Sequence, residues 1–240
     1  MTTINSNTTD NNNTNNNNNN ALIYSYDCEL GRWNTFSIPN SYLLKRQGAS
    51  STVLENGTAY IWGGKHLNSN KINTTDEEQK KQLSYMYRLD SIYPSNSTII
   101  YTLQNTIPPV RYQHTQTLIG GHSIVILGGF DGLTGSALSL TDIWLFDTNI
   151  NQWSHITAML GDELELSNRS SHSQVLMPDE TSILIFGGYD GYHVFNDVAV
   201  LDTKSWTWTI KNTNAVVQGR ADVSFKSIKY TLYDLKTNFY

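Results

Sequence analysis

The sequence predicts an all-β protein assembled from several copies of one small antiparallel sheet. Three double glycines each close a short aliphatic run, and they are Gly63-Gly64, Gly128-Gly129 and Gly187-Gly188. An arginine precedes each pair by 17 or 18 residues, and these arginines are Arg46, Arg111 and Arg169. Such self-similarity at a regular interval is the signature of repeat architectures. We therefore expect the function to depend on a surface formed by several copies and not on a single catalytic cluster.

The third and fourth units define the order of elements. The third unit begins with Arg111 and His114, continues through a strand to Gly120-Gly121, and returns in a strand that ends in Gly-Gly-Phe-Asp-Gly. A third strand ends at Asp147, and Trp153 opens a fourth strand six residues later. The fourth unit repeats these features at Arg169, His172, Gly187-Gly188, Asp202 and Trp208. Short strands joined by glycine, asparagine and aspartate turns predict one four-stranded antiparallel sheet per unit.

The other units are less complete. The second begins at Arg46, turns at the hairpin signal Asn56-Gly57, and carries an insertion at residues 65–84 between its second and third strands. The first keeps only its last two strands, with Trp33 opening the final one, and the last begins at Arg220 without a double glycine. The predicted organisation is a tail at residues 1–20 and one domain at 21–240. Within that domain we expect a partial unit, three full units and a degenerate one, at residues 21–39, 46–107, 111–158, 169–212 and 220–240.

Composition excludes several classes of protein. The 240 residues carry a net charge of −5 and no basic block, which argues against nucleic acid and membrane surfaces as partners. Cys28 is the only cysteine, so no disulfide framework is expected. Residues 1–20 contain 11 asparagines and neither the basic nor the apolar segment of a secretory signal. We therefore expect a disordered tail there and a cytoplasmic or nuclear location.

Taken together, these marks resemble the kelch repeat. The double glycine after an aliphatic strand, the apolar–aspartate pair and the later tryptophan recur in register over residues 21–212, and less well over 213–240. The resemblance implies a kelch-type β-propeller of about 4–5 blades, each with four antiparallel strands. Because the first and last units are partial, we expect an incomplete or truncated ring. An open arc leaves sheet surface uncovered, and we expect it to self-associate.

Each class of repeated residue has an expected structural role. The glycine pairs fit places where two backbones approach closely or where φ is positive. Large apolar side chains are expected to fill the contacts between blades. The residues assigned to these contacts are Tyr26, Leu89, Phe146, Leu201, Trp33, Trp153 and Trp208.

The candidate binding face lies on one side of the predicted ring. Because successive strands alternate in direction, the loops between second and third strands (b–c loops) and those between consecutive units (d–a loops) share that side. Loops on rigid scaffolds commonly carry recognition, and aromatic residues suit protein contacts. The residues assigned to the face are Arg46, Arg111, Phe130, Asp131, Arg169, Tyr189, Asp190, Tyr192 and His193. The expected partner is a protein whose identity the sequence does not give.

Structural roles compete with this assignment. Each repeated arginine can instead bind an aspartate or a carbonyl near its own loop. Asp131 and Asp190 suit turns, since a calcium loop needs more oxygen ligands. His114 and His172 suit packing or hydrogen bonding, since no acidic or cysteine partner sits at ligand spacing.

The sequence contains neither the catalytic motif Gly-x-Ser-x-Gly nor His-Glu-x-x-His. We therefore expect a non-enzymatic protein-interaction module or scaffold without cofactor or metal, as the kelch resemblance implies. Two alternatives stay open. One is a propeller enzyme of the oxidase type that uses the central channel, and the other is a truncated product without activity of its own.

Overall fold

The computed structural model describes residues 2–3, 22–38, 44, 46–66, 84–90, 96–100, 107–161, 165–211 and 217–222. These residues form β-strands, turns and loops, and no α-helix occurs among them. In these ranges there is accordingly no helix with the length and apolar character needed to cross a membrane. The all-β prediction is confirmed for this part of the chain.

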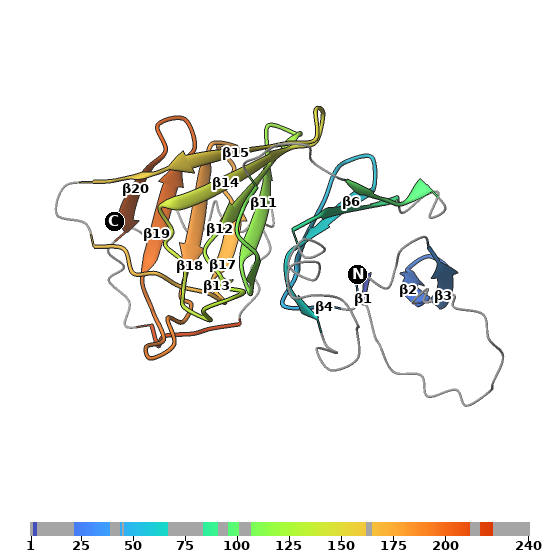
Figure 1. Ribbon diagram of the computed structural model, residues 1–240, viewed down its shortest axis with the longest axis horizontal. Helices are drawn as coiled ribbons and strands as arrows, with labels where there is room; N and C mark the ends of the chain where they lie inside the picture. Colours follow the sequence, from blue (N-terminus) through green and yellow to red (C-terminus); the bar gives the residue numbers. More distant parts are fainter. Residues whose placement is uncertain are drawn as a thin grey trace.

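Three large antiparallel sheets follow one another along the chain (Figure 1). Unit 2 consists of β5 (Ser50–Val53), β6 (Thr58–Trp62), β8 (Met86–Asp90) and β9 (Thr98–Ile100). Unit 3 consists of β11 (Thr115–Ile119), β12 (Ser123–Leu127), β14 (Asp142–Asp147) and β15 (Gln152–Thr157). Unit 4 consists of β17 (Ser173–Leu176), β18 (Ser182–Phe186), β19 (Val198–Asp202) and β20 (Thr207–Lys211). Unit 1 is the hairpin of β2 (Leu22–Asp27) and β3 (Arg32–Ser37), on which β1 (Thr2–Thr3) pairs with β2.

Short ribbons join the d–a loop before a unit to the b–c loop within it. In units 2 and 3 these ribbons are β4 (Arg46–Gln47) with β7 (Lys65–His66), and β10 (Arg111–Tyr112) with β13 (Phe130–Asp131). In unit 4 a single bridge between Ser170 and Tyr189 takes their place. The two kinds of loop therefore lie together, as the alternation of strand directions predicts.

One strand crosses from unit 3 to unit 4. After β15 the chain forms β16 (Met159–Leu160), which pairs in parallel with β20 and makes unit 4 five-stranded. An edge strand otherwise leaves a row of N–H and C=O groups open to other chains. β16 therefore covers the outer edge of unit 4 along part of its length.

The hydrophobic core lies between successive units, because side chains of a strand point alternately to its two faces. One cluster joins unit 1 to unit 2 through Ile23, Ile38, Leu44, Ile61, Tyr87, Leu89 and Ile99. A second joins unit 2 to unit 3 through Tyr60, Trp62, Met86, Ile124, Ile126, Trp144, Phe146 and Trp153. A third joins unit 3 to unit 4 through Val125, Leu127, Leu140, Ile143, Ala158, Ile183, Ile185, Ala199, Leu201 and Trp208.

The structure corrects the expectation for two of the residues assigned to inter-blade contacts. Tyr26 and Trp33 are exposed, and their rings contact each other in a tilted arrangement with centroids 5.2 Å apart. Ile23 and Phe36 occupy the face of the hairpin that packs on unit 2. Strand alternation therefore turns the aromatic pair to the opposite face, away from unit 2. The other five assigned residues are buried in the clusters between units.

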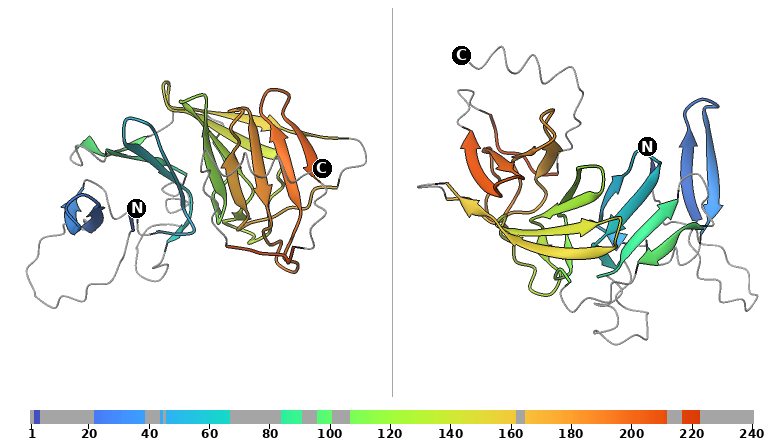
Figure 2. Two further views of the ribbon diagram at one scale, coloured as in Figure 1. Left: turned by 180° about the vertical axis from the view of Figure 1, so that it is seen from behind. Right: turned by 90° about the horizontal axis from the view of Figure 1, so that it is seen from above.

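The units lie side by side as an arc, with β2 and β3 at one end and β20 at the other (Figure 2). Contacts of β11 with β5 and with β17 place the first strands of units 2, 3 and 4 next to one another. The insertion at 65–84, the tail at 1–20 and the degenerate unit at 220–240 lie mostly outside the described residues.

Candidate functional site

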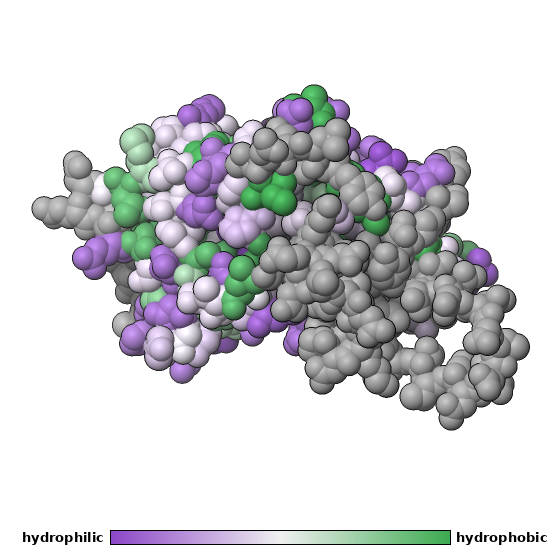
Figure 3. Space-filling model, viewed as in Figure 1, coloured by the Kyte–Doolittle hydropathy of each residue, from purple (hydrophilic) through white to green (hydrophobic). Residues whose placement is uncertain are grey.

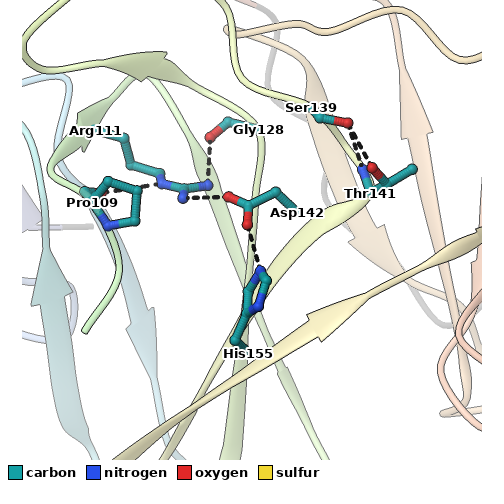
Figure 4. Close-up of polar contacts among 7 residues, drawn as sticks. All are labelled: Pro109, Arg111, Gly128, Ser139, Thr141, Asp142 and His155. Atoms are coloured by element: carbon teal, nitrogen blue, oxygen red, sulfur yellow. Dashed lines mark hydrogen bonds and ion pairs between the residues drawn. The ribbon is translucent and has the colours of Figure 1, made fainter. Parts of the chain in front are cut away.

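Arg111 ties the d–a loop before unit 3 to the glycine turn of the same unit (Figure 4). Its side chain is fully buried, and its guanidinium donates to the carbonyl oxygen of Gly128 at 3.2 Å and to Oδ2 of Asp142 at 2.8 Å. Oδ1 of Asp142 lies 2.6 Å from Nε2 of His155. Burial alone would raise the pKa of Asp142, but the hydrogen bonds and charges of Arg111 and His155 hold that pKa below its usual value.

Equivalent arginine contacts recur in the other units. Arg169 is 1% exposed and donates to the carbonyl oxygen of Gly187 at 3.0 Å and to the two carboxylate oxygens of Asp197 at 2.5 and 2.9 Å. Nη1 of Arg46 donates to the carbonyl oxygen of Gly63 at 3.1 Å. The arginines thus hold the glycine turns, as the structural alternative predicts.

Backbone hydrogen bonds link each unit to the next at the double glycines. The second glycine donates its N–H to the carbonyl of the arginine that begins the following unit, in the pairs Gly64–Arg111 (2.9 Å), Gly129–Arg169 (3.0 Å) and Gly188–Arg220 (2.8 Å). All six glycines of the pairs have positive φ. A Cβ on Gly128 would lie 2.5 Å from the carbonyl oxygen of Arg169, so the expected close approach of backbones is confirmed.

A second ladder of backbone bonds runs two residues after each arginine. The N–H of Gln113 donates to the carbonyl of Gly48, that of Ser171 to Gln113, and that of Asp222 to Ser171, at 2.7, 2.9 and 2.9 Å. These four residues have φ between 53° and 71°. The ladder fixes the d–a loops relative to one another, and it includes the start of the last predicted unit.

His114 and His172 are buried between units and bind hydroxyl groups of the preceding unit. Nε2 of His114 lies 2.6 Å from Oγ of Ser50, and Nε2 of His172 lies 2.7 Å from Oγ1 of Thr115. Ser50 donates to Oε1 of Gln116, so it accepts from His114, whose Nε2 carries the proton. Burial lowers the pKa of both imidazoles, to about 3 for His172. The hydrogen-bonding interpretation of these histidines is confirmed.

The b–c turns of units 3 and 4 are held by an aspartate and present an apolar side chain. Oδ1 of Asp131 accepts from the N–H groups two and three residues later, at 2.8 and 2.7 Å, and Oδ1 of Asp190 does the same at 2.7 and 2.6 Å. Backbone hydrogen bonds from His193 and Tyr192 lower the pKa of Asp190 to about 2. Leu133 and Tyr192, two positions after each aspartate, are 66% and 90% exposed.

An aromatic row connects the loops of units 2, 3 and 4. Nζ of Lys65 lies 3.6 Å from the ring centroid of Tyr112. The rings of Tyr112 and Phe130 are 5.4 Å apart, and those of Phe130 and Tyr189 are 6.2 Å apart in an edge-on arrangement. Aromatic pairs and cation–π contacts each stabilise by about 0.5–1.5 kcal/mol. The row therefore adds side-chain contacts to the backbone bonds that hold the loops.

The nine residues assigned to the binding face differ in exposure. The exposed residues are Tyr192 and His193, the partly exposed ones are Arg46, Asp131, Tyr189 and Asp190, and the buried ones are Arg111, Phe130 and Arg169. The buried members contribute to the support of the loops and not to their outer surface. Sequence reasoning missed Leu133, although it follows Asp131 as Tyr192 follows Asp190.

The carboxylate partners of the arginines were also missed. Asp142 and Asp197 each stand five residues before the aspartate that ends the third strand of their unit. An alignment of units 3 and 4 on that aspartate places Asp142 and Asp197 at the same position, and this recurrence could have identified them.

The surface in the view of Figure 3 mixes apolar and polar side chains, with the hydrophobic residues in separate small groups. Within the described ranges, no three histidine, cysteine, aspartate or glutamate side chains come together in a way that could hold a metal ion.

A family model of the KLHDC2/KLHL20/DRC7 Kelch-repeats domain matches residues 8–233. The chain belongs to the kelch-repeat family. The resemblance inferred from the sequence is thereby confirmed, and a kelch-repeat domain is usually a protein-binding module. Proteins with kelch domains are mostly non-enzymatic, although one similar protein is named tRNA wybutosine-synthesizing protein 2/3/4.

The kelch chain is similar to longer proteins. It is 26% identical over 184 residues to Kelch domain-containing protein 10 of Rattus norvegicus, which covers 74% of the chain and 39% of that protein. It is 27% identical over 198 residues to Kelch domain-containing protein 3 of Bos taurus, covering 78% and 46%. It is 27% identical over 155 residues to tRNA wybutosine-synthesizing protein 2/3/4 of Arabidopsis thaliana, covering 60% and 15%. The chain spans less than half the length of each.

Proposed function

We propose that this kelch chain binds a partner protein through the b–c and d–a loops of units 3 and 4. The ribbon of β10 with β13 and the bridge between Ser170 and Tyr189 hold these loops together. The backbone ladder fixes the d–a loops of successive units to one another. Loops held on a rigid scaffold are the usual carriers of recognition.

The equivalent exposure of Leu133 and Tyr192 carries the proposal. Single exposed apolar side chains are common and need no explanation. Here the exposed residue recurs at one position of two successive turns, and Asp131 and Asp190 fix the backbone of each turn. A preorganised turn loses little conformational entropy on binding, and tyrosine is a frequent anchor at interfaces. The expected partner offers apolar surface that spans both turns.

Affinity capture with quantitative mass spectrometry tests the proposal. The wild type is compared with the double variant Tyr192→Ala/His193→Ala and with Ile150→Ala. Ile150 is a matched control, because it is 61% exposed and lies in the turn between β14 and β15. Proteins that the wild type and the control capture, and the double variant does not, are then purified and titrated against all three chains.

We expect the double variant to bind such a partner about tenfold more weakly or worse, a loss of about 1.4 kcal/mol or more. The control should bind as the wild type does. Identical partner sets and affinities for all three chains would remove this face from consideration.

A further inference from the structure

Unit 1 turns a pair of aromatic side chains toward the end of the arc. Tyr26 and Trp33 lie opposite each other on β2 and β3 and are 41% and 57% exposed. Ile23 and Phe36, on the other face of the hairpin, belong to the cluster shared with unit 2. We call the surface formed by Tyr26 and Trp33 the leading face.

The same tryptophan position is buried wherever a preceding unit lies beside it. Counted from the aspartate that ends the third strand, Trp33 corresponds to Trp153 and Trp208, which are 4% and 0% exposed. Trp153 packs in one cluster with Trp62 of unit 2, with ring centroids 5.3 Å apart. Trp208 packs in one cluster with Leu127 of unit 3. A tryptophan in this register therefore contacts the apolar face of the unit before it.

The opposite end of the arc carries the counterpart of that apolar face. In unit 3, Val125 of β12 and Ile143 of β14 belong to the face that receives unit 4. Strand alternation and register identify the residues on the corresponding face of unit 4. Its apolar and partly exposed residues are Val175, Leu184, Val198 and Val200. They belong to none of the three clusters that the described residues form. We call them the trailing face.

We propose that the leading face of one chain docks on the trailing face of a second copy of the same chain. The two faces of one chain lie at opposite ends of the arc (Figure 2), so a second copy can bring them together without a change of fold. The contact would reproduce the one that joins unit 4 to unit 3. The residues of the two faces are uncharged, and the charged residues on the same side of unit 4, Asp202 and Lys211, are exposed.

Head-to-tail contacts satisfy both faces of every copy only when they close into a ring. The described residues of one chain form three large sheets and the hairpin of unit 1. Two copies hold twice that number, which lies within the range of about 4–8 blades found in propellers. A closed dimer is therefore the assembly that we expect.

Analytical ultracentrifugation of the full chain over a wide concentration range tests the proposal. The wild type should form a dimer as its concentration rises. Trp33→Lys removes the leading face and Val200→Lys the trailing face, and each should weaken dimerisation about thirtyfold or more, as the loss of a hot-spot contact does. The added lysines reduce the net charge of −5, so general repulsion cannot cause this loss.

An equal mixture of the two variants gives the sharpest result. One interface of a mixed dimer keeps both faces intact, so the mixture should regain dimers that neither variant forms alone. Ile150→Lys, at a site of similar exposure to Trp33, should dimerise as the wild type does. The loop variant Tyr192→Ala/His193→Ala should also dimerise, so this inference and the proposed function can fail independently.

A wild-type chain that stays monomeric at every concentration would overturn the proposal, and so would dimers that persist in both lysine variants. A mixture that behaves like its separate components would overturn it as well. Circular dichroism checks that each variant is folded, and Val175→Lys replaces Val200→Lys if that chain does not fold.

Discussion

Replacing Gly128 by alanine is expected to weaken the contact between units 3 and 4. At Gly128 φ is +57°, and an added Cβ would lie 2.5 Å from the carbonyl oxygen of Arg169 and 2.8 Å from Cε1 of His172. The left-handed backbone costs about 1–2 kcal/mol for alanine. The steric overlap costs about 1–3 kcal/mol, and displacement of the hydrogen bond from Gly129 to Arg169 about 1 kcal/mol. Together these effects lower the free energy of unfolding by about 3–6 kcal/mol.

Gly121 supplies the matched control for this change. Its φ is +74°, and an added Cβ would meet nothing within 4 Å. Alanine at Gly121 should therefore cost only the backbone contribution of about 1–2 kcal/mol. Urea unfolding followed by tryptophan fluorescence measures both variants under the same conditions. Equal losses at Gly128 and Gly121 would show that the approach of the two units is easily relaxed, and would refute the reasoning.

The remaining predictions concern the core, the arginine contacts and the buried histidines. Trp153→Ala should lower the free energy of unfolding by about 3–5 kcal/mol. Trp33→Ala, at the exposed equivalent position, should cost about 1 kcal/mol or less in the monomeric chain. Similar values in chemical denaturation at high dilution would contradict the burial difference. Arg169→Lys should cost about 2–3 kcal/mol in calorimetry, because an ammonium group cannot bind the carbonyl and both oxygens of Asp197 as the planar guanidinium does; full stability would show that the charge alone suffices. The pKa of His172 is about 3 in the folded chain against 6.5 ordinarily, so the unfolded state takes up the proton first as the pH falls. The stability that neutral His172 contributes is therefore present above about pH 6.5 and lost toward about pH 3. His172→Gln should make the free energy of unfolding less dependent on pH in that window. An unchanged slope of this free energy against pH would exclude His172 as the source of the dependence.

Most of the architecture could be predicted because its strongest signals are local. A double glycine marks positive φ and close backbone approach whatever surrounds it, so Gly128-Gly129 and Gly187-Gly188 locate equivalent strand ends from sequence alone. β16 gave no such signal, since the pairing of Met159–Leu160 depends on β20, which lies far along the chain. A two-residue segment carries too little periodicity to predict a strand.

The site was less predictable because exposure depends on neighbours that a repeat pattern does not specify. Trp33 and Trp153 share one position of the repeat, but among the described residues Trp153 is covered by unit 2 whereas Trp33 is 57% exposed. The arginine interval was visible, whereas the partner of Arg111 is Asp142, 31 residues away. The periodicity of a residue type therefore indicated structural importance without showing whether the side chain reached solvent.

The bonds from each double glycine to the following arginine have a practical consequence for dissecting the chain. The structural end of unit 3 is not Thr157, the last residue of β15, because Arg169 and His172 of the next segment bind Gly129 and cover Gly128. A fragment cut at Thr157 would lack this cover, whereas one extended through His172 would keep it. In such a repeat protein each unit contacts only its neighbours, so a deletion destabilises first the unit that adjoined the deleted segment.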